Sequence, residues 1–387
     1  MKNFPAKDKR EELILAQAFL LAANKCKISL SDRRELIKSV GTLQGLLEAN
    51  AFSKCNSTSS LREDVLINFQ ISYRGSYKRL QTELRDYNED ITIKLCNDKD
   101  FPNRLKLIDS CPCLLFGLGN NWNILNASNQ VAVVGSRTPS HYGMEVTRYL
   151  VSDLAQADVV VISGGAVGID SLAHRHCLKA EGQTCAVLGS GLNKPYPTSN
   201  KKLFAEICLN GGQVISEFLL DTPPKKQNFP QRNRLIAALA DALIVTEAGE
   251  KSGTLITADF AADYGRDVYA VPGSIFSGRS RSCHQLIKEG ALLLQSASDL
   301  ELMQQRQIEF PLSLETSATS KNQIDLTEEE RVVIQCLSMA PASLTDLSRK
   351  SELPVERLAL ILAHLQKDGF VDRARGLYTT RVSGYKF

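Results

Sequence analysis

Between residues 130 and 296, short apolar segments alternate regularly with longer amphipathic ones. The apolar segments are QVAVVGS, DVVVIS, QTCAVLGS, QVISEF, DALIVTEA, DVYAVPGS and ALLLQS, and several of them end in small residues. Continuous apolar runs suit the strands of a parallel sheet that helices cover on both faces. The alternation therefore predicts an α/β domain over residues 96–300 with a doubly wound, mostly parallel sheet, and a ligand beyond the carboxyl ends of its strands.

The regions on either side of this domain show other patterns. Apolar residues near a 3.6-residue spacing in LAQAFLLAA and DRRELIKSVGTLQGLLEAN predict a small helical domain over residues 1–95. Residues 99–120 are expected to form an extended, proline-punctuated connector, and the polar residues 301–325 a linker. Residues 326–387 suggest three helices followed by a hairpin in FVDRARGLYTTRV, which is the order of a winged-helix domain.

The net charge, the length of the apolar runs and the spacing of cysteines and histidines restrict the classes of protein to which the chain can belong. The formal net charge is only +3, so affinity for an anion must come from local patches. No apolar run reaches the length of a membrane span, and MKNFPAKDKREE has no apolar signal core, so a cytoplasmic protein without a membrane partner is expected. The ten cysteines are scattered and are expected to be buried free thiols. No histidine or cysteine spacing suits a metal site, and neither a metal nor a cofactor is expected.

The common catalytic and cofactor fingerprints of such a sheet are missing from the sequence. No Gly-x-Gly-x-x-Gly follows a strand segment, and no acidic residue takes the ribose-binding position. The segment GEKSGT at 249–254 lacks the leading glycine of a Walker A loop. Neither Gly-x-Ser-x-Gly nor His-Glu-x-x-His occurs. The sequence therefore predicts a binding protein without catalytic residues rather than an enzyme.

Three strand-end turns carry groups suited to an anion: Gly135-Ser136-Arg137, the turn from Ser163 to Asp170, and Ser252-Gly253-Thr254. In a doubly wound sheet such turns meet at one edge, where helix N-termini favour an anion and an arginine fork suits phosphate oxygens. Alternatives remain. The glycines could serve only a tight turn and close helix packing, Asp170 could only cap a helix, and Arg137 could be an ordinary surface residue.

A cationic segment that contains an aromatic residue precedes another helical pattern. Its members are Lys225, Lys226, Phe229, Arg232 and Arg234. Cations interleaved with a ring suit a single nucleic-acid strand, with charges on the backbone and the ring on a base. Because the two arginines are two positions apart, they cannot share a helix face. One is expected to pair within the protein and the other to face the ligand. The alternative makes Phe229 a core residue.

The ordered set of motifs resembles one family over about residues 100–295, the DNA-processing protein A (DprA/Smf) family. The motifs are VAVVGSR, ISGGAVGIDSLAH, AVLGSGLNKPYP, VISEF, FPQRNRLIAALA, EAGEKSGTLITA, YAVPGS and LIKEGA. The resemblance implies an extended Rossmann-like domain that binds single-stranded DNA, usually as a homodimer. It implies a bacterial mediator that protects incoming DNA and helps load the RecA recombinase during natural transformation.

By the same resemblance, Arg137 and the GGAVGID turn would hold DNA phosphates, Lys226 would contact a phosphate and Phe229 a base. The full set of expected DNA-binding residues is Ser136, Arg137, Ser163, Gly164, Gly165, Ala166, Gly168, Lys226, Phe229, Arg232, Asn233, Arg234, Ser252, Gly253 and Thr254.

Some segments depart from the family pattern. Ser280-Arg-Ser282-Cys283-His284 stands where the family usually has Ser-x-Gly-x-Asn, and the N-terminal region lacks a Gly-x-Gly hairpin. In the third helix of the winged-helix region, Arg357 and Lys367 are balanced by acidic neighbours. A helix that reads DNA is normally more basic, so protein contact or dimer support is the expected role of this region.

Two other functions stay open at the level of sequence. A nucleotide-cleaving enzyme of the related lysine-decarboxylase-like group would carry Pro-Gly-Gly-x-Gly-Thr-x-x-Glu at a strand end. The corresponding EAGEKSGTLITA lacks both the Pro-Gly-Gly and the acid, with Thr257 and Ala258 where the acid would fall. The other alternative is a transcription regulator built on the winged helix.

Overall fold

The computed structural model describes residues 9–48, 61–83, 90–249, 252–303, 327–339, 342–351, 353–367, 370–374 and 377–380. The chain divides into two compact units, Met1–Pro311 and Leu312–Phe387, and each is described by itself. The expected linker over 301–325 lies, beyond residue 303, outside the described residues. No described helix is both long enough and apolar enough to cross a membrane.

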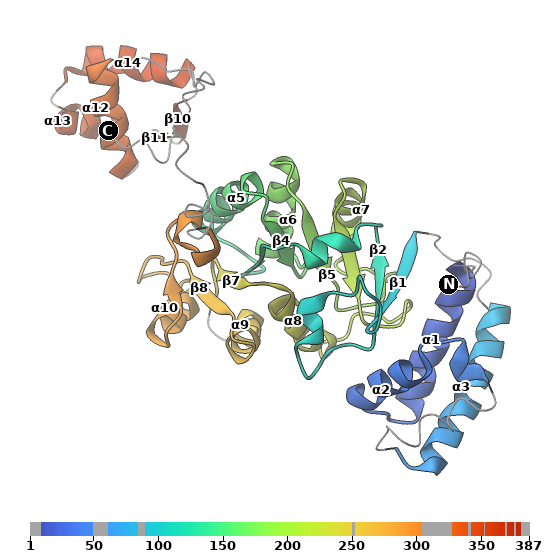
Figure 1. The fold of residues 1–387 in the computed structure, drawn as a ribbon. Coiled ribbons are helices and arrows are strands. Elements are labelled where there is room, and N and C mark those ends of the chain that lie inside the picture. Colours follow the sequence, from blue (N-terminus) through green and yellow to red (C-terminus); the bar gives the residue numbers. More distant parts are fainter. Residues whose placement is uncertain are drawn as a thin grey trace, which may run out of the picture. The chain divides into compact units, whose positions relative to one another are not determined.

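The first unit begins with a group of helices, as the 3.6-residue spacing predicts (Figure 1). They are α1 (Lys9–Lys25), α2 (Leu30–Val40), the 3-10 turn η1 (Gly45–Leu47) and α3 (Glu63–Glu83). The Ser29 side chain accepts a hydrogen bond from the Asp32 N–H and so caps α2, which ends at Gly41 in a left-handed conformation. Phe19, Phe69 and Tyr73 pack edge-to-face and stacked between α1 and α3.

A nine-stranded sheet follows, in the order β1-β2-β6-β5-β4-β3-β7-β8-β9. Its strands are β1 (Ile91–Leu95), β2 (Leu114–Leu118), β3 (Gln130–Val134), β4 (Val160–Ser163), β5 (Thr184–Val187), β6 (Gln213–Ser216), β7 (Ala242–Val245), β8 (Asp267–Ala270) and β9 (Leu292–Leu293). All pairs from β6 to β9 are parallel, and only the pairs that include β2 are antiparallel. The predicted doubly wound, mostly parallel sheet is therefore confirmed.

Helices cover both faces of this sheet (Figure 1). One group comprises α5 (His141–Gln156), α6 (Ile169–Lys179) and α7 (Lys201–Leu209), and the other α8 (Asn228–Leu239), α9 (Gly253–Asp263) and α10 (Arg281–Lys288). Short elements connect them: α4 (Asn103–Lys106), η3 (Trp122–Asn126), η4 (Thr198–Asn200) and η5 (Ala297–Asp299). Alternate residues of β3 face the two layers, because Val131 and Val133 pack with α5 whereas Ala132 and Val134 pack with α8.

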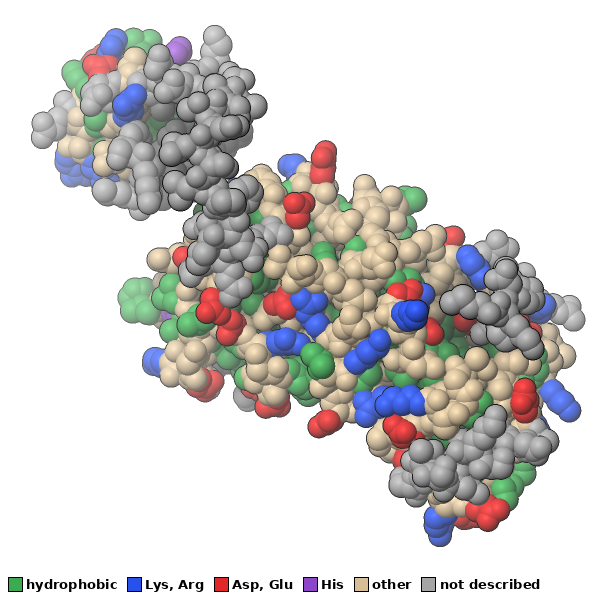
Figure 2. Space-filling view, viewed as in Figure 1, with side chains coloured by type: hydrophobic (Ala, Val, Ile, Leu, Met, Phe, Trp, Pro, Cys, Tyr) green, Lys and Arg blue, Asp and Glu red, His purple; other side chains and the backbone are tan. Residues whose placement is uncertain are grey.

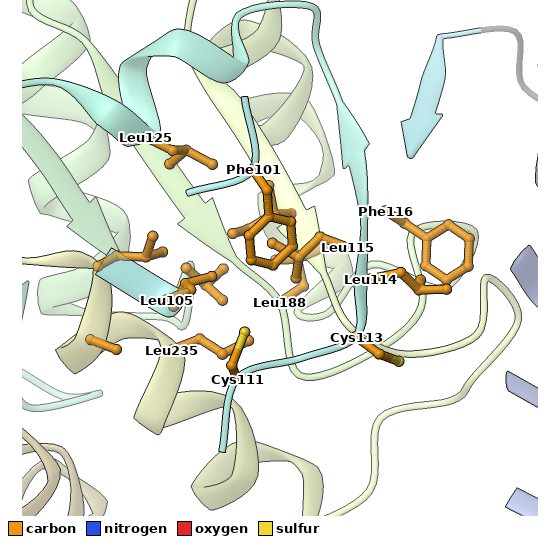
Figure 3. Packing of buried hydrophobic residues seen from close by; sticks show 14 of the residues in the cluster. Phe101, Leu105, Cys111, Cys113, Leu114, Leu115, Phe116, Leu125, Leu188 and Leu235 are labelled. Atoms are coloured by element: carbon orange, nitrogen blue, oxygen red, sulfur yellow. The ribbon is translucent and has the colours of Figure 1, made fainter. Parts of the chain in front are cut away.

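The segment expected to be a connector contributes to the sheet instead. Residues 91–95, which the expected boundary placed in the helical part, form β1, and residues 114–118 form β2 inside the predicted connector. Figure 3 shows why this segment is held: Phe101, Leu105 and Leu115 are packed in the core near Leu188 and Leu235. Burial of these side chains fixes the segment against α8 and the sheet.

The second unit has the predicted winged-helix order. Its elements are α12 (Glu328–Met339), α13 (Leu344–Ser351), α14 (Val355–Lys367) and the antiparallel strands β10 (Val371–Ala374) and β11 (Leu377–Thr380). Val333, Leu347, Leu358 and Leu365 form its core. Among the described residues all cysteines are free thiols and most are buried, as expected.

Candidate functional site

A hollow of about 690 Å³ lies at the carboxyl ends of the central strands, and we call it the crevice. The chain leaves β3 toward β4 on one side, whereas β7 lies on the other side of β3, so the loops after β3 and β7 diverge. Such a switch point is where doubly wound sheets place their ligands. The crevice is formed by the loops after β3, β4, β5 and β7 and by the start of α8.

Most of the residues expected from the sequence line the crevice. They are Ser136, Arg137, Ala166, Lys226, Phe229, Arg232, Asn233, Ser252, Gly253 and Thr254. The structure does not bring the other expected residues to it, namely Ser163, Gly164, Gly165, Gly168 and Arg234. Tyr196, which the sequence reasoning missed, also lines it.

The ring of Phe229, half-buried in the first turn of α8, is the centre of the crevice. The guanidinium carbon of Arg137 lies 5.6 Å from its centroid and that of Arg232 lies 6.0 Å from it. The ring of Tyr196 lies 5.7 Å away, tilted by 56°, and Tyr196 is 46% exposed. Arginine forks next to an aromatic face are a favourable arrangement in themselves. Two rings and two cations thus surround one open space.

Arg137 and Lys226 are the available cations of the crevice. Both side chains are exposed, and neither makes a hydrogen bond or ion pair with any residue that the structure describes. Figure 2 shows lysine and arginine side chains across the middle of this unit's visible face, with acidic ones among them. The attraction for an anion is therefore local to such unpaired cations rather than a property of the whole surface.

The loop that carries Arg137 is fixed at both ends by Glu247, which follows β7. The N–H of Ser136 donates to the Glu247 carbonyl at 2.6 Å. The N–H and hydroxyl of Ser140 donate to the buried Glu247 carboxylate at 2.7 and 2.6 Å. Because the loop is held in place, a ligand of Arg137 does not have to order the backbone.

Arg232 has a structural role beside the crevice. It is 4% exposed and donates hydrogen bonds to the carbonyls of Gly164, at 2.5 Å, and Val187. Burial lowers the pKa of Arg232 to about 10, while nearby Asp170 raises it. Burial likewise raises the pKa of Asp170, and Arg232 counteracts this. The arginine thus neutralises the carboxylate that Asp170 brings to the crevice.

Arg234 does not line the crevice, so the structure does not bring it to the place where its expected DNA contact would be made. Its Nη2 donates to Oε2 of Glu217 at 2.5 Å, and both side chains are 6% exposed. Arg234 is thus the arginine that pairs within the protein, as expected of one of the two.

The glycine turn after β4 is built by packing rather than as an open cradle. A Cβ on Gly168, where φ is +85°, would lie 2.3 Å from the Ser136 carbonyl oxygen. A Cβ on Gly164 would lie 2.7 Å from the Asp170 carboxylate. The hydroxyl of Ser163 is buried and donates to the Val133 carbonyl at 2.6 Å. These contacts explain the residues as close-packing positions, and of residues 163–168 only Ala166 lines the crevice.

The N-terminus of α9 opens into the crevice. The Ser252 side chain accepts from the Thr254 N–H at 3.2 Å, which is a helix cap. A Cβ on Gly253 would meet no atom within 4 Å, so the backbone there is accessible. A helix N-terminus carries a partial positive charge that favours an anion. Glu250 and Lys251 lie outside the described residues.

Over the part of the chain that the structure describes, no group of histidine, cysteine and acidic side chains could hold a metal ion. The crevice offers cations, a helix N-terminus and aromatic faces. This set of groups can bind an anionic chain that also carries flat rings.

Comparison with known families gives two matches. Residues 92–304 match the family described as DNA recombination-mediator protein A, and residues 317–376 match the DprA winged helix domain. Protein Smf of Escherichia coli is 36% identical over 252 residues, which are 65% of this chain and 67% of that protein. The DNA processing protein DprA of Bacillus subtilis is 36% identical over 236 residues, 60% of this chain and 79% of that protein.

Two solved structures are similar. The DNA processing protein A of Streptococcus pneumoniae superposes with a TM-score of 0.59 at 33% identity, over 73% of this chain and 96% of that chain. A structure of DNA processing protein A from Helicobacter pylori, described by its single-stranded DNA binding mode, gives 0.50 at 27% identity, over 57% of this chain and 98% of that chain.

Proposed function

The chain belongs to the DNA recombination-mediator protein A family, and from that premise we propose that its crevice binds single-stranded DNA. The observation that carries this is a pair of cations, Arg137 and Lys226, that make no hydrogen bond or ion pair with any described residue and that line one hollow together with the Phe229 ring. The similar protein from Helicobacter pylori, whose description names single-stranded DNA binding, supports it.

Some groups of the crevice suit the DNA backbone and others suit the DNA bases. Arg137, Lys226 and the α9 N-terminus would hold phosphates, since charged forks and helix N-termini suit phosphate oxygens. Phe229 and Tyr196 would stack on bases, which requires bases whose faces are free. A duplex offers no such faces in its interior, so a single strand fits the crevice better.

The wider role rests on the family. We propose that the protein protects incoming single strands and helps load the RecA recombinase during natural transformation, as a cytoplasmic homodimer. The description of the family as a recombination mediator supports this. Binding without catalysis is part of the proposal, because Thr257 lines the crevice near the place where a nucleotide-cleaving relative would carry its acid.

Lys226→Ala tests the contact with phosphate. We expect weaker binding of every single-stranded sequence, and a plot of log affinity against log salt that is shallower by about 0.7, because one fewer counterion is released. The measurement is salt-dependent binding of labelled oligo-dT. Lys179→Ala, an exposed lysine at the end of α6 outside the crevice, is the matched control. An unchanged salt slope in Lys226→Ala would reject the phosphate contact.

Phe229→Ala tests the contact with a base. Loss of a stacking face costs about 1–3 kcal/mol of binding, which is roughly thirtyfold in affinity at the middle of that range, with the salt slope unchanged. Phe229→Leu keeps apolar volume against Gly189, which the ring contacts, and still removes the aromatic face. We expect Phe229→Leu to melt near the wild-type temperature and to bind weakly. Wild-type affinity in the leucine variant would show that the ring serves packing only.

A further inference from the structure

A second hollow, of about 420 Å³, lies on the other side of the segment that carries Lys226 and Phe229, and we call it the inner pocket. It is enclosed by α1, the start of α2, the start of β2, the loop after β6 and the start of α8. Along the shared segment, Lys225 and Asn228 line the inner pocket, while Lys226 and Phe229 line the crevice. The two hollows therefore lie on opposite sides of this segment.

Three buried polar atoms on or next to the lining of the inner pocket have no hydrogen-bond partner among the described residues. They are Oε1 of Glu217, Nδ2 of Asn228 and Nη1 of Arg234. Asn228 is 4% exposed, and Glu217 and Asn228 both line the pocket. Arg234 does not line it but is the ion-pair partner of Glu217. Buried polar groups are nearly always satisfied, so two such atoms on the lining of one hollow indicate that something polar fills it.

Charge in the pocket is balanced by the protein itself. Burial raises the pKa of Glu217, and the guanidinium of Arg234 and the amide of Gln231 at the rim counteract that effect. Oε2 of Glu217 is taken by Arg234, which leaves Oε1 as the acceptor that faces the hollow. Arg33, which also lines the pocket, acts on Glu217 in the same direction as Arg234. The free acceptor on Glu217 and the free donor on Asn228 suit a group that both donates and accepts.

The wall of the pocket is mixed: Leu20, Leu30, Leu114 and Phe218 are apolar lining residues, and Asn24, Arg33, Thr222 and Gln227 are polar ones. A volume of 420 Å³ is within the range of roughly 300–1,000 Å³ that small-ligand pockets occupy. A mixed wall with a free acceptor on Glu217 and a free donor on Asn228 matches a flat heterocycle whose edge carries donors and acceptors side by side. A nucleobase on its Watson–Crick edge has this character.

We propose that the inner pocket takes one base of the bound single strand and contacts its edge through Glu217 and Asn228, while Phe229 stacks on a neighbouring base. This inference rests on the proposed function of the crevice. The exposed Lys225 stands at the rim, where the phosphate between the two bases would pass. The strand would then be held on both sides of the first turn of α8.

The test compares two oligonucleotides of equal length. One is oligo-dT, and the other carries difluorotoluene in place of every thymine, which keeps the ring shape and the phosphates but removes the hydrogen-bonding edge. Because every base is replaced, sliding of the strand along the site does not blur the comparison. The full-length protein is expected to bind the difluorotoluene strand about tenfold or more weakly, since buried polar groups of the pocket lose their partners.

Single-residue variants test whether the difference in affinity between the two oligonucleotides arises in the inner pocket. Asn228→Ala should bind oligo-dT more weakly than the wild type does. The gap, which is the ratio of its affinities for oligo-dT and for the difluorotoluene oligonucleotide, should fall to a few-fold. Asn210→Ala, an exposed asparagine at the end of α7, is the matched control and should keep the full gap. If Asn228→Ala does not fold, Thr222→Trp decides, because it fills the pocket from its lining and removes none of the three buried polar atoms.

The outcomes separate this inference from the function on which it rests. Equal affinity of the wild type for both strands would mean that the pocket holds only water, and would overturn the inference while the crevice still binds DNA. A gap that persists in Asn228→Ala and in Thr222→Trp would place the base contact elsewhere and would overturn it as well. Failure of the folded wild type to bind either strand would reject the proposed function first, and this inference with it.

Discussion

Arg234→Met is expected to lower the free energy of unfolding by about 3–5 kcal/mol, because it leaves Glu217 as a buried carboxylate without its partner. The ion pair is 2.5 Å long, and both side chains are 6% exposed. A methionine fills similar volume but offers no charge or hydrogen bond. The measurement is chemical denaturation near neutral pH, where the loss appears as a lower midpoint with a similar slope.

The control is the double variant Glu217→Leu with Arg234→Met. Replacing both members of a buried ion pair by apolar residues is often neutral or stabilising, so much of the lost stability should return. Lys225→Met, an exposed cation on the same segment, should cost little by comparison. A wild-type midpoint for Arg234→Met would mean that the ion pair does not support the fold.

Acid should destabilise the first unit through His174, which is fully buried in α6. Thr184 donates its hydroxyl to the Val161 carbonyl at 2.6 Å, so it accepts from Nδ1 of His174 at 2.7 Å. Nδ1 therefore carries the proton, and Nε2 has no partner among the described residues. Burial, with a further contribution from Arg232, lowers the pKa of His174 to about 3.

The direction in which stability changes with pH follows from proton binding to the folded and unfolded chains. Below the ordinary pKa of 6.5 the unfolded chain takes up a proton at His174 that the folded chain refuses until about pH 3. The stability contributed by this group is complete above pH 6.5 and is lost as pH falls from 6.5 toward 3. The expected loss is about 1.4 kcal/mol per pH unit within that window.

His174→Gln keeps a donor for Thr184 but cannot titrate, so stability measured from pH 6.5 to 4.5 should fall less steeply by one proton. Thr184→Val gives the opposite control: it lowers stability at every pH by removing the hydrogen bond, and it keeps the proton-dependent slope. The same slope in His174→Gln as in the wild type would contradict the assignment.

The central strands and the crevice could be predicted from sequence because both follow from local patterns. QVAVVGS and DALIVTEA are apolar runs that end in small residues, and they form the adjacent strands β3 and β7. Once such strands are parallel, the residues that follow them share one edge of the sheet. The sequence alone therefore places Arg137 and Gly253 together, although more than a hundred residues separate them, and both line the crevice.

What could not be predicted depends on partners far away in the chain. The CPCLLFGLG segment has the pattern of a connector because β2 pairs with β6, and nothing local announces that partner. Gly165 has the pattern of a phosphate cradle, but it is Phe204, from α7, that fills the space beside it. Tyr196 was missed because only the fold brings the loop after β5 against Phe229.

The antiparallel insertion of β2 beside β6 sets an order of events during synthesis. Phe116 pairs with Ser216, so the strand made early cannot complete its ladder until about a hundred further residues have left the ribosome. Pairings that distant in sequence close slowly, because a long loop must first lose entropy. The parallel strands β3, β4 and β5 can pair with one another while β2 still waits for β6. The sheet edge that contains β2 is therefore synthesised before the central strands but joins them only after β6 has been made.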